Sequence, residues 1–340
     1  MRKLQILVLV HKDFVPPETI EGLSEEEIEP WKTEYDVVSS LQNMGHDTHT
    51  LGVEDELKPL RDAITEWRPQ IVFNLLEEFR GLGTYVPYIL GYLELMRQAY
   101  TGCNPRGMML ATSKALQRKV YKHHRILAPD FFAVARGRTI KRPRRLGFPL
   151  IVKSGTEHGS VGISQASIVH DDEKLKDRVA FIHEQVHSDA IVEQFIEGRE
   201  LYVGVIGNER LRTLPVWEMI FDNLPEGAPR IATSKIKWDA KYQKKVGLKT
   251  HAAKDIPDGV TDRIMRVCKR AYRALGQSGY ARMDLRLTEN NEIYLLESNP
   301  NPQLAYDEDF AESAHAVGID FEQLLERIIR LGLNYHSVLI

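Results

Sequence analysis

The sequence predicts a protein of mixed α/β class, built from two or three domains or subdomains. Its 340 residues exceed the usual size of one hydrophobic core, so more than one core is expected. Continuous apolar runs at residues 4–10 and 71–76 are typical of buried parallel strands, and helical patterns lie between and after them. This alternation of strand and helix predicts an α/β layer domain over roughly residues 1–110.

The composition excludes several classes of protein. Lys and Arg number 45 against 48 Asp and Glu, so the chain lacks the basic surplus of a nucleic-acid-binding protein. Cys103 and Cys268 are too few for a disulfide framework or a thiolate metal site, which predicts buried thiols in a reducing cytoplasm. The apolar run from Leu4 to Val10 is too short to span a bilayer, and no cleavage pattern follows it. We therefore expect a soluble cytoplasmic protein with neither a nucleic-acid nor a membrane partner.

A second unit is expected to begin near Ser113, where the sequence becomes helical and basic. This pattern ends at Ala128-Pro129, and FFAV, an apolar stretch typical of a strand, follows. Later, Thr261 to Leu275 carries apolar residues at helical spacing, and Gly276 is placed to end that helix. Further strands are expected at residues 150–153, 191–194 and 201–206.

Two charged segments are typical of solvated surface. The glutamate-rich stretch at 18–29 predicts an exposed loop and helix start, with a flap beside a substrate as the alternative. The basic loop at 136–145 predicts a linker, although its charge could also attract an anionic substrate. Neither segment is assigned chemistry.

The segment ARMDLRLTENNEIYLLESNPNP, residues 281–302, alternates apolar and polar residues on both sides of a turn and predicts a β-hairpin. A turn centred on Asn290-Asn291, a pair that tolerates positive φ, would place Asp284 opposite Glu297. The same register would place Arg282 opposite Asn299. Because directly opposed residues share a face of a sheet, these four side chains are expected to lie together.

Such a group has the chemistry of a magnesium phosphate site. Asp284, Glu297 and Asn299 would direct three hard oxygen donors to one point, which suits Mg2+ held jointly by carboxylates and nucleotide phosphates. Arg282 would stand beside the ion. For any single acidic residue the alternative is the solvated face of an antiparallel sheet, but four polar residues in register are harder to explain in that way.

A glycine-rich loop is the second motif. In LIVKSGTEHGSVGIS a predicted strand ends in Lys153, and the loop after it includes Gly159 and Ser160. Glycines let backbone N–H groups approach a phosphate, and the lysine adds a positive charge. The loop is not a Walker A motif, because no Gly-Lys-Ser/Thr sequence opens a helix. If the loop is considered by itself, a flexible turn explains its sequence equally well.

Two further motifs carry weaker signals. In VEQFIEGRE, Glu193 and Glu200 could bind adenine amino and ribose hydroxyl groups, although either glutamate alone is more typical of the surface. In WDAKYQKK, residues 238–245, Lys241 and Tyr242 could belong to a basic flap, and a solvated loop explains that segment equally well.

Taken together, the motifs resemble the ATP-grasp fold, and within it the D-alanine-D-alanine ligase family. The resemblance runs from about Ile71 to Ala305, and its specificity lies in the order of the motifs: Lys114, Lys153 with its loop, Glu193 to Glu200, Lys241-Tyr242, Arg282-Met-Asp284 and Glu297-Ser-Asn299. It implies an α/β (α+β) ATP-grasp fold with an N-terminal Rossmann-like, or pre-ATP-grasp, domain. The implied units are residues 1–110, then ATP-grasp subdomains at 111–196 and 197–340.

The resemblance also implies roles for individual residues. Contacts with ATP are implied for Lys114, Lys153, Gly159, Ser160, Glu193, Gln194, Ile196, Glu200 and Lys241. Two Mg2+ ions, for which Mn2+ could substitute, would be held by Asp284, Glu297 and Asn299. Catalytic positions are implied for Arg282, which would face a developing oxyanion, Lys241, which would reach the terminal phosphate, and Tyr242, which would border the substrate.

Departures from the family pattern gather around the substrate. The His-Gly and Gly-Glu-Asp-Gly signature of the first domain is replaced by LLEEFRGLG, residues 75–83, and Gly159 stands where family ligases have serine. The glutamate that these ligases carry after the first strand has no clear counterpart in VHKDFVPPE. Gln303 stands where the family has glycine. These changes predict retained ATP chemistry and an altered substrate.

The predicted function is therefore an ATP-dependent carboxylate-amine ligase that forms an amide or peptide bond through an acyl phosphate and releases ADP and phosphate. Its partners would be small carboxylate and amine substrates such as amino acids or short peptides. A homodimer is expected only by family analogy. Two alternatives remain: an authentic D-alanine-D-alanine ligase, and a non-catalytic ATP-binding regulatory protein.

Overall fold

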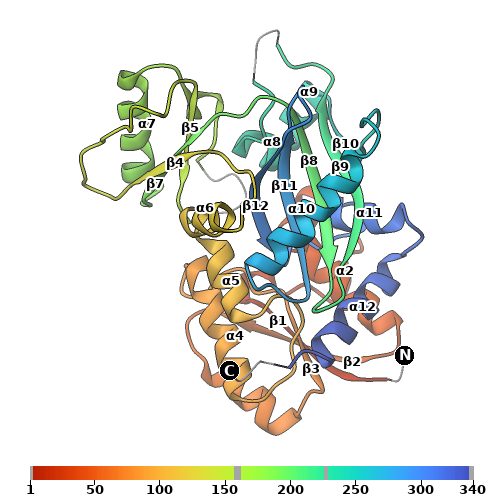
Figure 1. Cartoon of the computed structure of the whole chain (residues 1–340). Helices are drawn as coiled ribbons and strands as arrows, with labels where there is room; N and C mark the ends of the chain where they lie inside the picture. Colours follow the sequence, from red (N-terminus) through yellow and green to blue (C-terminus); the bar gives the residue numbers. More distant parts are fainter. Residues whose placement is uncertain (1–2, 157–161, 226–228, 337–340) are drawn as a thin grey trace.

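The computed structural model describes residues 3–156, 162–225 and 229–336. Within these ranges the strands form three sheets (Figure 1): a three-stranded sheet of order β2-β1-β3, a four-stranded sheet of order β4-β7-β5-β6, and a five-stranded sheet of order β10-β9-β8-β11-β12. Helices and sheets are mixed throughout, as predicted. In the described ranges no helix is both long and apolar enough to cross a membrane.

The first sheet is parallel and is built around β1, Gln5–His11. This strand pairs with β2, Asp47–Val53, on one side and with β3, Ile71–Asn74, on the other. Six of the seven residues of β1 are buried, which accounts for its continuous apolar sequence. The two strands predicted in this region are confirmed. The helices of this part are α1 Glu25–Ile28, α2 Lys32–Asn43, α3 Lys58–Asp62, α4 Val86–Leu95 and α5 Pro105–Thr112.

The central sheet is antiparallel and follows α6, Lys114–His123. Helix α7, Asp172–Gln185, packs against it through an apolar cluster that includes Val152 and Ile182. The predicted linker at 136–145 is an exposed connection between β4 and β5. The strands are β4 Phe131–Val134, β5 Leu150–Ser154, β6 Ile168–Val169 and β7 Ala190–Gln194.

The large antiparallel sheet is covered by α10, Val260–Ala274, within one residue of the helix predicted from the sequence. Its apolar face packs Ile264, Cys268 and Tyr272 against β8 and β11, and both cysteines of the chain are buried free thiols, as predicted. The loop alternative for residues 238–245 is wrong, because two short helices, α8 and α9, occupy that part of the chain. The remaining bounds are β8 Arg199–Ile206, β9 Arg212–Phe221, β10 Leu248–Ala252, β11 Tyr280–Leu287, β12 Ile293–Pro300, α8 Ser234–Trp238 and α9 Ala240–Val246.

Helix α11, Asp309–His315, packs against β9 of the large sheet, and α12, Phe321–Leu333, returns to the first sheet. Leu324 and Ile328 of α12 belong to the same buried cluster as Ile6 of β1 and Phe73 of β3. The beginning of the chain and α12 thus share one core. The division into units at 1–110, 111–196 and 197–340 remains a prediction.

Candidate active site

The hairpin of β11 and β12 brings the predicted polar group together. Arg282 pairs with Asn299 and Asp284 pairs with Glu297, so the register predicted from the sequence is confirmed at these positions. The Arg282 guanidinium donates to both carboxylate oxygens of Asp284, at 2.8 and 3.0 Å, and lies over the ring of Tyr202. Asp284 is only 6% exposed, so the solvated-face alternative is wrong for this residue.

The assumed centre of the hairpin is wrong. The strand pairs nearest the turn lie one residue away from the register that a turn centred on Asn290-Asn291 requires. A bulge after Asp284 absorbs Leu296 on β12 and restores the predicted pairing. Without this bulge Leu296 would lie opposite Asp284, and Glu297 would point to the other face of the sheet. The bulge therefore assembles the site.

The donor set fits Mg2+ shared with phosphate oxygens. The amide nitrogen of Asn299 lies 3.0 Å from Asp284 Oδ2 and 3.5 Å from Glu297 Oε1, so three oxygen-bearing side chains meet at one place. Rotation of this amide would present its oxygen instead of its nitrogen. Two carboxylates and one amide suit a hard cation that completes its shell with phosphate and water, as Mg2+ does in nucleotide sites.

Lys114 connects this hairpin to α6. It is 4% exposed, and its Nζ lies 3.6 Å from Glu297 Oε2. Burial lowers the pKa of Lys114, the positive charges of Lys153 and Arg118 lower it further, and Glu297 and Glu193 act in the opposite direction. Several cations are therefore crowded beside the candidate metal ligands. A polyanion would relieve their mutual repulsion.

A buried ion-pair group lies next to it. Glu193, at the end of β7, is 0% exposed and accepts a hydrogen bond from Arg118 Nε at 2.6 Å, with Lys153 Nζ at 3.1 Å from its other oxygen. Burial alone would raise the pKa of Glu193, but Arg118 and Lys153 outweigh it and the pKa is lowered. The surface alternative for Glu193 is wrong. Arg118 was missed, although it follows Lys114 by one helical turn and therefore shares its face.

Glu200 is also buried, so its surface alternative is wrong as well. It accepts a hydrogen bond from the Tyr202 hydroxyl at 2.9 Å and from Arg286 at 2.6 Å. Arg286 lies directly opposite Glu200, on β11. Arg286 was missed, although it follows Asp284 by two residues on β11 and so shares its face of the strand.

The other predicted residues have different surroundings. Lys241 is exposed on α9, and Tyr242 lines a cavity of about 550 Å³ together with residues 162–166 and 233–235. Gln194, the last residue of β7, is exposed, and Ile196, between β7 and β8, is buried. Gly159 and Ser160 lie outside the described residues.

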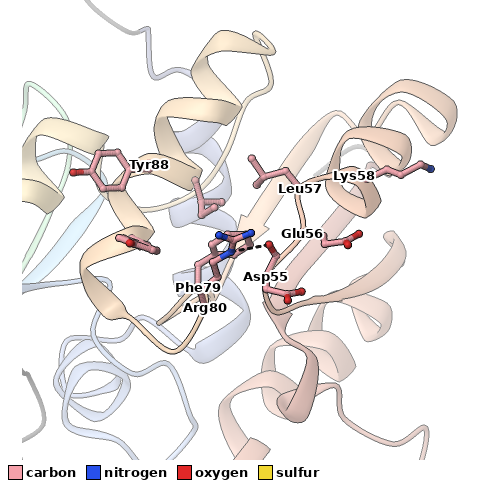
Figure 2. Close-up of a pocket in the computed structure, with 9 residues that line it drawn as sticks. Asp55, Glu56, Leu57, Lys58, Phe79, Arg80 and Tyr88 are labelled. Atoms are coloured by element: carbon pink, nitrogen blue, oxygen red, sulfur yellow. Dashed lines mark hydrogen bonds between the residues drawn. The ribbon is translucent and has the colours of Figure 1, made fainter.

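A second cavity, of about 520 Å³, lies in the first unit (Figure 2). Its walls include Leu57, Phe79 and Tyr88, and Arg80 Nε donates to the backbone oxygen of Asp55 at 3.1 Å. None of the residues predicted for the active site lines this cavity.

Comparison with known proteins agrees with this geometry. A family model described as the D-ala D-ala ligase C-terminus matches residues 120–330, which is more than half of the chain. The chain belongs to the D-alanine-D-alanine ligase family. The resemblance of its motifs to this family is thereby confirmed.

This chain is similar to individual members of the family over most of its length. It is 29% identical over 315 residues to the D-alanine-D-alanine ligase of Desulforudis audaxviator, which covers 92% of this chain and 96% of that protein. It is 32% identical over 249 residues to the D-alanine-D-alanine ligase of Desulfotalea psychrophila, covering 72% and 74% of the two chains. The Bacillus anthracis D-alanine-D-alanine ligase in complex with ATP superimposes with a TM-score of 0.73 at 20% identity over 97% of each chain, which supports the ATP-grasp fold.

As a member of this family, the chain is an ADP-forming carbon-nitrogen ligase that uses ATP and Mg2+. The alternative of a non-catalytic ATP-binding protein is wrong.

Proposed function

We propose that this ligase activates the carboxylate of one small amino-acid-type substrate and joins it to the amine of a second, and that D-alanine is not its preferred substrate. The observation that carries the catalytic half of the proposal is the group of Arg282, Asp284, Asn299 and Glu297 on one face of the hairpin, with Lys114 beside it. The departures in residues 75–83 and at Gly159 support the substrate half.

In the proposed reaction the substrate carboxylate attacks the γ-phosphate of ATP to give an acyl phosphate and ADP. The amine of the second substrate then attacks the acyl carbon, and phosphate leaves. Mg2+ held by Asp284, Glu297 and Asn299 would neutralise charge on the phosphoryl group. Two ions are proposed, with Mn2+ as a substitute, on the family resemblance.

The residues of the chain supply position and charge. Lys114 and Lys153 would bind phosphate oxygens, and Lys241 would approach the terminal phosphate from α9. Arg282 would face the oxyanion of the tetrahedral intermediate, where a fixed cation stabilises the transition state more than the substrate. Tyr242 would border the substrate. Nucleotide contacts are proposed for the remaining set: Gly159, Ser160, Glu193, Gln194, Ile196 and Glu200.

The organisation of the molecule is proposed on similar grounds. Each of the three sheets falls within one of the ranges 1–110, 111–196 and 197–340, which supports the proposed units. The composition is the ground for proposing a cytoplasmic location. The family resemblance is the ground for proposing a homodimer.

The substrate half predicts that D-alanine as sole substrate gives little ATP-dependent phosphate release, and that Gly159→Ser does not restore it. A substrate ammonium group needs a complete set of partners, and each buried polar group left unpaired costs about 1 to 3 kcal/mol. Steady-state phosphate release across a panel of amino acids and short peptides measures this. A kcat/KM for D-alanine comparable to that of the best substrate would identify the authentic D-alanine-D-alanine ligase instead.

The proposed contact of Lys153 with ATP phosphates predicts that Lys153→Ala weakens ATP binding by about 10-fold or more. This is the usual effect of losing a charge-assisted hydrogen bond. The fold should survive because Arg118 still pairs with Glu193. Calorimetric titration with ATP measures the affinity, and Lys174→Ala, an exposed lysine on α7, is the matched control. Unchanged ATP affinity in folded Lys153→Ala would remove this lysine from the nucleotide site.

A further inference from the structure

The cavity that Tyr242 lines lies between elements of two sheets. On the side of the central sheet its walls are residues 162–166, which precede β6, and α7. On the side of the large sheet they are residues 233–235 and α9. Its volume of about 550 Å³ is within the usual range for a small-molecule site. Among the described lining residues, only Tyr242 has a role implied by the family resemblance, so most of this cavity is unassigned.

The two charged residues that the structure describes on the walls of this cavity are both cations, Arg178 of α7 and Lys235 of α8. No carboxylate of a described residue lines the cavity, and neither cation forms an ion pair within the described ranges. The chain as a whole carries more Asp and Glu than Lys and Arg, so this excess of positive charge is local. A cavity lined by charge of one sign attracts ligands of the opposite sign.

Arg178 is buried, and its hydrogen bonding is incomplete. The residue is 9% exposed, its Nη2 donates to the backbone oxygen of Gly162, and its Cζ lies 4.2 Å from the centre of the Phe181 ring. Its Nε has no hydrogen-bond partner in the part of the chain that the structure describes. Burial lowers the pKa of Arg178, and no described carboxylate opposes this effect. Because a guanidinium stays charged in proteins, this buried cation lacks an anion.

Lys235 reaches the cavity from α8. Its Nζ lies 4.5 Å from the centre of the Tyr242 ring, so α9 holds the ammonium group beside the cavity. The backbone of α8 is fixed at this point, because the Thr233 hydroxyl accepts a hydrogen bond from the N–H of Ile236 at 3.2 Å. An aromatic ring attracts a cation without neutralising its charge. Both cations are therefore positioned by rings and remain available to an anion.

The two sides of the cavity contact each other through neutral groups. The backbone N–H of Ser234 donates to the backbone oxygen of Ile163 at 2.9 Å. The side-chain amide of Gln165 donates to the backbone oxygen of Pro229 at 3.3 Å. These contacts bring the two cations to one cavity, but they do nothing to offset the charges.

We propose that this cavity binds a small organic anion whose carboxylate or phosphate group pairs with Arg178 and Lys235. Apolar parts of the lining, including Ile163 and Phe181, suit the carbon skeleton that carries the charged group. A neutral ligand would leave both cations unpaired, whereas an anion would connect α7 to α8 through charge-assisted hydrogen bonds. The inference goes beyond the proposed function, since the binding needs neither ATP nor a reaction.

Calorimetric titrations at low ionic strength, where charge is least screened, test the inference. The probes are glutarate, a dicarboxylate, and glycerol phosphate, an organic phosphate, and their neutral analogues are glutaramide and glycerol. At least one anion should bind about 10-fold or more tightly than its neutral analogue. The anion with the larger preference identifies the charged group, carboxylate or phosphate, that the cavity accepts.

Variants locate the binding. Lys235→Met removes a cation from an exposed position, so the fold should persist, and most of the preference for the anion should be lost. Arg178→Met removes the buried cation and should have the same effect, with circular dichroism used to check its folding. Lys244→Met is the matched control, because Lys244 is an exposed lysine of α9 that does not line the cavity.

The candidate active site also holds cations, so Lys153→Ala is titrated in parallel. Loss of the preference in Lys235→Met and its retention in Lys153→Ala and Lys244→Met would support the cavity. If neither anion binds more tightly than its neutral analogue, or if Lys235→Met keeps the full preference, the inference is overturned. Because no turnover is measured, failure of the proposed ligase reaction would leave these results unchanged.

Discussion

Glu297→Ala is expected to reduce turnover by about 10-fold or more, as loss of a metal ligand or its support does in other enzymes. The carboxylate of Glu297 is 3.5 Å from the Asn299 amide and 3.6 Å from Lys114 Nζ, at the point where β12, β11 and α6 meet. The defect should appear chiefly as a higher Mg2+ concentration needed for half-maximal rate. Phosphate release measured across a Mg2+ titration checks this.

Two companion variants separate the metal from the fold. Glu297→Gln keeps the shape of the side chain and removes its charge, so it should show the same shift in Mg2+ dependence. Glu292→Ala removes an exposed carboxylate from the turn of the same hairpin and should leave the Mg2+ dependence unchanged. Wild-type turnover of Glu297→Ala at limiting Mg2+ would disprove the metal assignment.

Arg118→Met is expected to lower the free energy of unfolding by about 3 to 5 kcal/mol, the usual cost of removing one partner from a buried ion pair. Glu193 is fully buried and would keep only Lys153. Because the pKa of Glu193 is lowered in the fold, its pairing stabilises the protein above about pH 4.5, and this stabilisation is lost as pH falls further. Urea unfolding at pH 7 and at pH 4 should therefore show a smaller effect of the variant at the lower pH.

The control is a pair of the same chemistry on the surface. Arg142 pairs with Asp172, which is largely exposed, so Arg142→Met should change stability much less. Equal effects of the two variants would mean that the Arg118 pair contributes no more than a surface contact.

The parts of the fold that the sequence predicted are those with a local periodic signal. The hairpin itself could be deduced because apolar and polar residues alternate on both sides of a turn, and α10 because its apolar residues recur at helical spacing. β2 was missed because DTHTLGV offers neither a continuous apolar run nor a clear alternation. The bulge that places Glu297 was invisible, since an extra residue in one strand leaves no mark in its composition.

The candidate site likewise contains residues that the sequence could group and a pairing that it could not predict. Asp284, Glu297 and Asn299 lie within one short segment, so the sequence could group them. The pairing of Arg118 with Glu193 joins positions 75 residues apart. No local pattern predicts such a pairing. Without knowledge of its partners, burial of Glu193 is not expected, because burying an unpaired carboxylate costs free energy.

The core shared by β1 and α12 has a consequence for how this protein is made. A ribosome that has synthesised β1, β2 and β3 has not yet produced Leu324 and Ile328, which cover Ile6 and Phe73 in the finished molecule. Nascent domains generally fold in the order in which they emerge, but this first sheet keeps an apolar face open until α12 has left the ribosome. The part of the protein that is made first is therefore the part that is completed last.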